Sequence, residues 1–204
     1  MARRRGQVDE KKSEAILEAA AALFAEKGLS ASMEEIARLA GVSKQTVYNR
    51  FASKLEIARA MANQKAEAIV APLRSSGSPL VVLEAFAQGL LTLVCHPDKV
   101  SSMRGVVLLS ADAPELAQTV YEAGPRRSLS LLSAWLAEQT RAGRLNTPNP
   151  DEAAEMFTGL VLGHAHLRSM LNVPQIDDER RAHRAREAAR IFVTAYAPTL
   201  DQAR

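Results

Sequence analysis

A chain of 204 residues, 47% of them hydrophobic, is large enough to bury a core in one or two domains. Its formal net charge of +3 lies entirely in residues 1–60, which hold 11 basic and 8 acidic residues, whereas residues 61–204 hold 15 of each. A basic N-terminal part on a neutral body favours a polyanionic partner such as nucleic acid, with a chance excess as the alternative.

The cysteine content and the apolar runs predict where the protein works. The single cysteine, Cys95, excludes an internal disulfide and fits a reducing compartment. Charged residues rather than an apolar run follow Arg3–Arg5, so we expect no signal peptide. The longest apolar run, residues 79–95, is interrupted by Glu84 and Gln88, which argues against a membrane span. We therefore expect a cytoplasmic protein with no membrane association.

Apolar residues recur at helical spacing along the chain, and no segment alternates as a strand does, which predicts an all-α fold of about nine helices. Residues 1–8 are expected to form a disordered basic arm. Capping residues and breaks, among them a break at residues 112–115, then place the helices, in chain order, at about 13–28, 32–41, 44–50, 53–73, 80–95, 99–111, 116–141, 151–172 and 177–196. Gly124 and Pro125 interrupt the seventh of these helices.

The segment 33–51 has the pattern of a helix-turn-helix. A glycine, Gly41, separates two short helices, and glycine permits the backbone geometry that lets two helices cross steeply. Ala37 is small enough for close approach, while Val47 and Phe51 are the apolar residues that would hold the second helix against the first. The remaining polar faces of that second helix are then free to enter a DNA major groove. The alternative is a solvated helical hairpin in an unrelated α-protein.

The polar side chains of this second helix suit DNA recognition. Gln45 and Asn49 can each offer a donor and an acceptor to an adenine edge. Thr46 supplies a hydroxyl for a base or a phosphate and a methyl for thymine. Tyr48 and Lys54 are placed for phosphate oxygens.

The block of residues 16–57 closely resembles the N-terminal domain of the TetR family of transcriptional regulators. The matching elements are "AALFAEKG", "SMEEIARLAGVS" and "TVYNRFASK", in the family's order and spacing. Residues 110–145 and 150–163 resemble a C-terminal domain of AcrR- or AefR-like regulators. The resemblance implies a helix-turn-helix DNA-binding domain over residues 9–53 and a ligand-binding and dimerisation domain over residues 54–204.

The resemblance also implies site residues. The family's recognition-helix positions and its phosphate contact at the fourth helix fall on Lys44, Gln45, Thr46, Tyr48, Asn49 and Lys54. Gln45 stands where the family usually has a small residue, which leaves the base preference open and makes Gln45 a candidate for specific reading. The sequence "SKLEI" in place of the commoner "SKEAL" is expected to change little.

The resemblance further implies a homodimer that reads an inverted repeat. Gly159 and Gly163, four residues apart, and a stripe on the last helix are the candidate interface, with packing inside one subunit as the alternative. The stripe consists of Ala185, Ala189, Phe192 and Tyr196.

A pocket for a small-molecule inducer in the C-terminal body is implied as well. Its candidate lining residues are aromatic, polar or flexible side chains in otherwise apolar helices, and for each of them a place in the core is the alternative. They are Phe86, Met103, Tyr121, Trp135, Phe157 and His164. The spacing of the histidines and the lone cysteine predicts no metal site, and no cofactor is expected.

These features predict a ligand-responsive transcriptional regulator that acts most simply as a repressor on a double-stranded DNA operator. An activator of the same fold and a non-specific DNA-binding protein are the alternatives. No phosphate-binding glycine loop, nucleophile elbow or H-E-x-x-H motif is present, so an enzyme is not expected.

Overall fold

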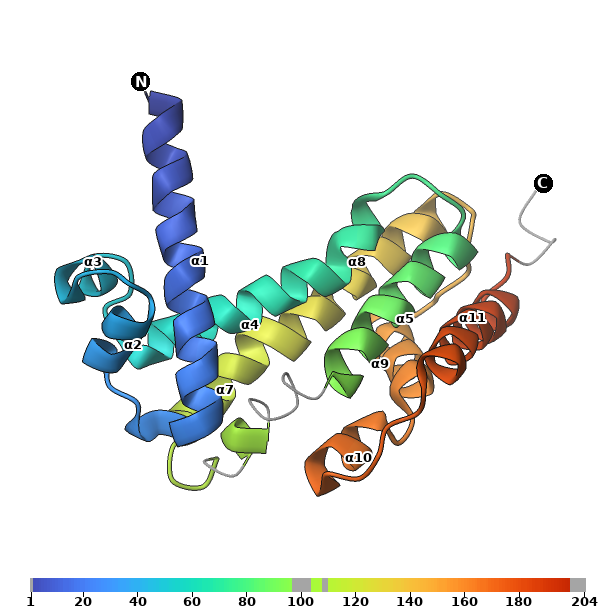
Figure 1. Cartoon of the computed structure of the whole chain (residues 1–204). Coiled ribbons are helices and arrows are strands. Elements are labelled where there is room, and N and C mark those ends of the chain that lie inside the picture. Colours follow the sequence, from blue (N-terminus) through green and yellow to red (C-terminus); the bar gives the residue numbers. More distant parts are fainter. Residues whose placement is uncertain (1, 97–103, 108–109, 199–204) are drawn as a thin grey trace. The chain divides into compact units, whose positions relative to one another are not determined.

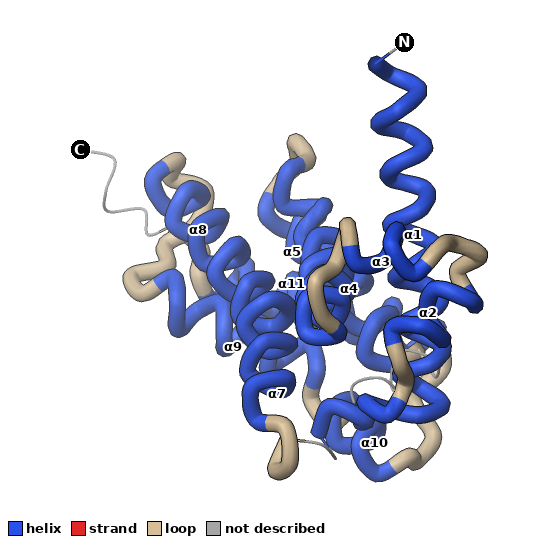
Figure 2. The backbone as a smooth tube through the Cα atoms, turned by 90° about the vertical axis from the view of Figure 1, so that its left-hand side faces the viewer, coloured by secondary structure: helices blue, strands red, loops and turns tan. Residues whose placement is uncertain are grey.

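The computed structural model describes residues 2–96, 104–107 and 110–198, and throughout these ranges the regular structure is helical (Figures 1 and 2). Met103, one of the candidate pocket residues, lies outside them. The chain divides into two compact units, one of Met1–Gln64 with Ser101–Ala123 and one of Lys65–Val100 with Gly124–Arg204. The predicted all-α class is confirmed. The predicted boundary after residue 53 differs from this division, because residues 54–64 and 101–123 also belong to the first unit.

The first unit holds the N-terminal helices and one helix from the middle of the chain. They are α1 (Ala2–Lys27), a 3-10 turn (Gly28–Ser30), α2 (Met33–Leu39), α3 (Lys44–Tyr48), the first part of α4 (Lys54–Val70) and α7 (Pro114–Tyr121). Its core is built from α1, α2, α3 and α4, with Ile16, Ile36, Val47 and Ile57 fully enclosed. Each of these four helices therefore contributes at least one apolar residue to the core that holds the small bundle together.

The second unit is also built from helices. They are α5 (Pro79–Cys95), α8 (Arg127–Arg141), α9 (Pro150–Leu162), α10 (Ala165–Leu171) and α11 (Asp178–Ala195), with a 3-10 turn (Ala71–Arg74) before α5. Helix α11 packs against α5 and α9, and α8 packs against α9. Phe157 lies at the centre of the core, with its ring centroid 6.2 Å from that of Phe86 and 4.9 Å from that of Phe192. None of the helices in the described ranges is long and apolar enough to cross a bilayer.

The predicted interruption at Gly124 and Pro125 is present as a turn of π-helix, Glu122–Arg126, directly before α8. Proline has no backbone N–H, so the regular i to i−4 bond is lost there and the helix widens. The Ser128 hydroxyl donates to the carbonyl of Gly124 at 3.1 Å, which satisfies a backbone acceptor at this turn.

The predicted start of the first helix is wrong: α1 begins at Ala2 rather than at Ser13. Ser13 is not a cap, and its hydroxyl donates to the carbonyl of Asp9 at 3.2 Å inside the helix. Arginine, glutamine, glutamate and lysine favour helices, so nothing in the sequence before Ser13 ends one apart from Gly6.

The apolar stripe that we predicted as a dimer interface faces the core of its own unit instead. Ala185, Ala189 and Phe192 are buried in the core of their own unit, because this face of α11 lies against α5 and α9. Gly163 is not part of a helical face either: it ends α9 with a φ of 46°. Apolar residues exposed on these helices are instead Met156 (54%) and Leu160 (42%) on α9 and Ile191 (44%) on α11.

Candidate nucleic-acid interface

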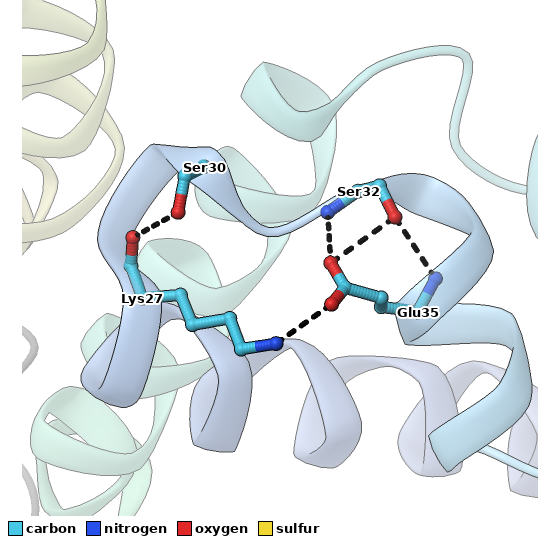
Figure 3. A network of polar contacts seen from close by, with 4 residues as sticks. All are labelled: Lys27, Ser30, Ser32 and Glu35. Carbon is cyan, nitrogen blue, oxygen red and sulfur yellow. Dashed lines mark hydrogen bonds and ion pairs between the residues drawn. The ribbon is translucent and has the colours of Figure 1, made fainter.

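Helix α2 begins with the predicted capping box. The Ser32 hydroxyl accepts from the backbone N–H of Glu35 at 3.2 Å, and the Glu35 carboxylate accepts from the backbone N–H of Ser32 at 2.8 Å (Figure 3). The Lys27 ammonium donates to the same carboxylate at 2.7 Å, so the end of α1 is joined to the start of α2. The Lys27 ammonium, together with the Ser32 N–H and hydroxyl, lowers the pKa of Glu35 to about 2.

The turn between α2 and α3 depends on Gly41, which has a φ of 65°. The N–H of Gly41 donates to the carbonyl of Arg38 at 3.3 Å, and that of Val42 donates to the carbonyl of Ala37 at 3.0 Å. These two bonds form a Schellman motif, which ends a helix with a residue in the left-handed region. Gly41 therefore ends α2 and begins the turn that leads to α3.

Helix α3 is held to the unit by one of its five residues. Val47 is the buried residue of α3 and is 0% exposed. Phe51, just beyond the helix, is half-buried against the same core, and its N–H donates to the carbonyl of Val47 at 2.8 Å. At the other end Ser43 caps the helix by accepting from the N–H of Thr46 at 3.1 Å. The expected attachment through Val47 and Phe51 is present.

The other side chains of α3 leave a polar face exposed. Gln45, Tyr48 and Asn49 are exposed, and Thr46 is half-buried with its hydroxyl 2.8 Å from that of Ser43. The Gln45 side-chain amide donates to the Asn49 side-chain oxygen at 2.8 Å. This hydrogen bond brings together two side chains that the sequence predicts as readers of base edges.

Lys44 is engaged by its neighbours in this structure. Its ammonium forms an ion pair with Glu34 of α2 and lies 5.8 Å from the centroid of the Tyr48 ring. The hydrogen bond with Glu34 raises the pKa of Lys44, and the same bond lowers the pKa of Glu34. Both side chains are well exposed, so solvent screens the pair strongly. A phosphate would have to compete with this carboxylate for Lys44.

Lys54 is the first residue of α4 and is half-buried. The helix start is fixed by Ser53, whose hydroxyl accepts from the N–H of Glu56 at 3.2 Å, and by Glu56, whose carboxylate accepts from the N–H of Ala52 at 2.8 Å. Lys54 thus sits on a well-defined helix start within the first unit, as the predicted phosphate contact requires.

Arg50 is a residue of this region that the sequence did not single out. Its guanidinium forms an ion pair with the Asp9 carboxylate, and it donates to the Asp9 carbonyl at 2.6 Å and to the Ser13 hydroxyl at 2.7 Å. Arg50 follows directly after Asn49, the C-terminal cap of α3. The two partners lie about forty positions away in sequence, so no local pattern could have indicated them.

The candidate pocket residues are divided between the two units. Phe86, Trp135 and Phe157 belong to the buried core of the second unit. Tyr121 belongs to the first unit and is exposed, and His164 is exposed at the N-terminal cap of α10. Within the first unit, a shallow surface pocket of about 370 Å³ is lined instead by Leu55 and residues 112–116. The predicted ligand contacts therefore remain predictions.

The geometry of residues 32–54 defines a class of protein. Two short capped helices cross at a glycine turn, and the second presents an exposed polar face while a single side chain anchors it. This arrangement is a helix-turn-helix DNA-binding domain.

The comparisons with known proteins agree with this class. The family model described as bacterial regulatory proteins, tetR family, matches residues 16–61. The model described as AefR-like transcriptional repressor, C-terminal domain, matches residues 81–198. The chain therefore belongs to the TetR family of transcriptional regulators. A search of the curated proteins finds no match.

Solved structures of TetR-family regulators resemble the whole chain. One from Mesorhizobium loti MAFF303099 is 25% identical, with a TM-score of 0.76 over 93% of this chain and 98% of that chain. The flavonoid-responsive regulator FrrA is 31% identical, with a TM-score of 0.68 over 93% and 98% of the two chains. A TetR regulator from Agrobacterium tumefaciens is 26% identical, with a TM-score of 0.74 over 92% and 95%.

Proposed function

We propose that this protein is a ligand-responsive transcriptional repressor that binds an inverted-repeat operator as a homodimer and is released by a small-molecule inducer. The observation that carries the DNA-binding part is the exposed polar face of α3, in which Val47 is the one buried residue. A helix that commits one side chain to the core has its other faces available for base edges and phosphates.

The roles of the side chains follow from their chemistry and placement. Gln45 and Asn49 read base edges, because each amide carries both a donor and an acceptor. Thr46 and Tyr48 contact a base or the backbone through their hydroxyls, and Lys44 and Lys54 contact phosphates. Contacts to phosphate position the helix, whereas contacts to base edges give the preference for one sequence.

The repressor role and the response to a ligand are supported by the relatives. The C-terminal model that matches residues 81–198 is described as that of an AefR-like transcriptional repressor. The similar regulator FrrA is described as flavonoid-responsive. An inducer releases the operator if it binds better to a conformation that DNA does not select. Flavonoids are accordingly the first ligands to test, and a chromosomal operator would place the protein in the cytoplasm.

The homodimer is supported by exposed apolar side chains on the second unit. Met156 and Leu160 on α9 and Ile191 on α11 are each more than two-fifths exposed, and α9 packs against α11. Burying such residues against a second copy removes apolar surface from water. A dimer presents two α3 helices to half-sites about 34–36 Å apart, or a multiple of that spacing, and an operator of this kind is an inverted repeat.

Selection of DNA from a random library tests the proposal. The purified protein is expected to enrich an inverted repeat and to bind it at least about 10³-fold more tightly than random DNA at physiological salt. A protein that binds all duplexes equally would be a non-specific coating protein instead. The double variant Gln45→Ala/Asn49→Ala is the control, because it keeps the anchor at Val47 and should lose the enrichment.

A reporter gene behind the selected operator then separates repression from activation. A repressor lowers reporter expression, and an activator raises it. Addition of flavonoids to the same reporter tests for an inducer, with direct binding measured by calorimetry on the purified protein. Release of the operator fragment by a flavonoid in a gel-shift titration is the expected result.

A further inference from the structure

The net charge of this chain lies in its first twelve residues. Residues 1–12 contain five basic and two acidic side chains, whereas residues 13–60 contain six of each and residues 61–204 contain 15 of each. The helix-turn-helix by itself is therefore electrically balanced. Phosphate contacts supply most of the affinity of proteins for DNA, so the excess charge at the start of α1 requires an explanation.

Two of the cations of the helix-turn-helix region are already occupied by carboxylates. Lys44 is paired with Glu34, and Lys27 is paired with Glu35. The structure thus places carboxylates where a helix-turn-helix would otherwise offer free positive charge. This pairing increases the need for another source of phosphate contacts.

The core of the first unit begins well inside α1. The side chains of residues 9–12 are exposed, and the first residue that α1 contributes to the core is Ile16. Figures 1 and 2 show the N-terminal end of α1 extending beyond α2 and α3. A short helical segment is marginal in water by its own backbone hydrogen bonds, so contacts between the start of α1 and the rest of the unit matter here.

Arg50 supplies such contacts at Asp9 and Ser13. Its guanidinium binds the carboxylate and the carbonyl of Asp9 together with the hydroxyl of Ser13. The Arg50 side chain is 20% exposed and that of Asp9 is 57% exposed, so solvent screens the ion pair on its Asp9 side. Because Arg50 directly follows the C-terminal cap of α3, these bonds join α1, at Asp9 and Ser13, to the end of the recognition helix.

The arginines lie a short distance beyond this contact. At a rise of about 1.5 Å per residue, the helical positions of Arg3–Arg5 are roughly 6–9 Å along the axis from Asp9. Lys11 and Lys12 follow Asp9 on the same helix and are exposed. Residues 2–12 thus carry five basic side chains, and Asp9 within this segment is bonded to Arg50, which lies just after α3.

We propose that residues 2–12 are a second DNA-contacting surface, which binds phosphates beside the base pairs that α3 reads, and that Arg50 and Asp9 are the positioning residues that hold it there. The inference rests on the proposed function of α3. On this basis the specific contacts come from a neutral helix-turn-helix, and a separate cationic segment supplies much of the electrostatic affinity.

Salt titrations on the selected operator duplex, with ten extra base pairs on each side, test the surface. The variant Arg3→Gln/Arg4→Gln/Arg5→Gln is expected to flatten the plot of log K against log salt by roughly 0.9 for each phosphate that is no longer neutralised, up to a total of about 3. Its thermal midpoint should equal that of the wild type, because the core of α1 starts only at Ile16. The triple variant Arg141→Gln/Arg180→Gln/Arg186→Gln removes the same charge from the second unit and should leave the slope unchanged.

The direction of the change in DNA affinity separates the positioning role of Asp9 from a general effect of net charge. Asp9→Asn and Glu10→Gln each remove one negative charge from adjacent exposed positions, but only Asp9 binds Arg50. General attraction to DNA predicts tighter binding for both variants. The positioning role predicts tighter or equal binding for Glu10→Gln and weaker binding with a flatter slope for Asp9→Asn.

The outcomes are distinguishable from failure of the proposed function. If the wild type enriches no sequence, the proposed function fails. If it enriches an operator while the Arg3–Arg5 variant keeps the wild-type slope, the second surface does not exist. If Asp9→Asn tightens binding as Glu10→Gln does, the bond to Arg50 has no positioning role.

Discussion

The side-chain amide of Gln45 donates to the side-chain oxygen of Asn49 at 2.8 Å, across one turn of the exposed face of α3. The bond leaves the oxygen of Gln45 and the amide group of Asn49 available. The pair therefore presents the Gln45 oxygen as an acceptor and the Asn49 amide group as a donor from neighbouring positions, so we expect the two residues to read DNA as a unit.

Replacement of Gln45 or Asn49 by alanine should cost about 1–3 kcal/mol on the preferred operator and little on random DNA, because base contacts carry the discrimination. Because the two side chains are bonded to each other, the double variant should lose less than the sum of the single losses. Fluorescence anisotropy with both duplexes gives the full double-mutant cycle. Additive losses would show that the two residues act separately, and equal losses on both duplexes would show that they contact only the backbone.

Glu34→Gln should strengthen DNA binding on every sequence. The substitution removes the carboxylate that pairs with Lys44, so Lys44 becomes available to a phosphate and the salt slope should steepen by about one. Glu18→Gln is the matched control, since Glu18 is an exposed carboxylate of the same unit. Equal strengthening by both substitutions would point to net charge rather than to release of Lys44.

The capping box should make the first unit sensitive to acid. The pKa of Glu35 is lowered to about 2 from an ordinary value of 4.5, so below pH 4.5 the unfolded chain binds a proton that the folded chain does not. Stability from this group is therefore fully present above about pH 4.5 and is lost as the pH falls towards 2. Urea unfolding between pH 5 and pH 2.5, at about half-unit steps, should show a weaker pH dependence in Glu35→Gln than in the wild type. Identical pH profiles would show that the contacts of Glu35 do not persist in solution.

Lys54→Ala should weaken binding to all sequences by a similar factor and flatten the salt slope by about one, because a phosphate contact carries no sequence information. Salt titrations on the operator and on random DNA measure both quantities. An unchanged slope would show that Lys54 neutralises no phosphate. A loss confined to the operator would instead assign Lys54 to base reading.

Leu160→Glu and Ile191→Glu should produce a monomer at concentrations where the wild type is a dimer, because each places a charge on the exposed apolar surface of α9 or α11. Analytical ultracentrifugation measures the change, and operator affinity should fall with it. Val81→Glu, at an exposed apolar position of α5, is the control and should leave the dimer intact. Dimers in all three variants would place the interface elsewhere.

Much of the first unit could be predicted because its signals are local. Ser32 and Glu35 are three residues apart, and their capping box has the predicted geometry. Gly41 has the positive φ that ends α2, and Val47 is the one buried residue of α3. In each case the residue type and the spacing determine the local structure with little help from the rest of the chain.

The remaining features depend on interactions between distant segments. The helical backbone of residues 2–8 continues past Ser13, whereas the sequence predicted a cap there, and the bond between Arg50 and Asp9 joins positions 41 residues apart. The stripe of Ala185 and Phe192 is apolar whichever neighbour it faces, so periodicity could not separate internal packing from a dimer interface. Packing against α5 and α9 decides that question.

The attachment of α3 through Val47 has a consequence for how such regulators diverge. Substitutions at the other positions of α3 disturb no buried side chain, so they can alter the preferred operator while the free energy of unfolding stays nearly constant. New operator preferences can therefore arise by single substitutions in α3 that each leave a folded protein. Within α3, residue 47 is the position where the need for a buried apolar side chain limits substitution most.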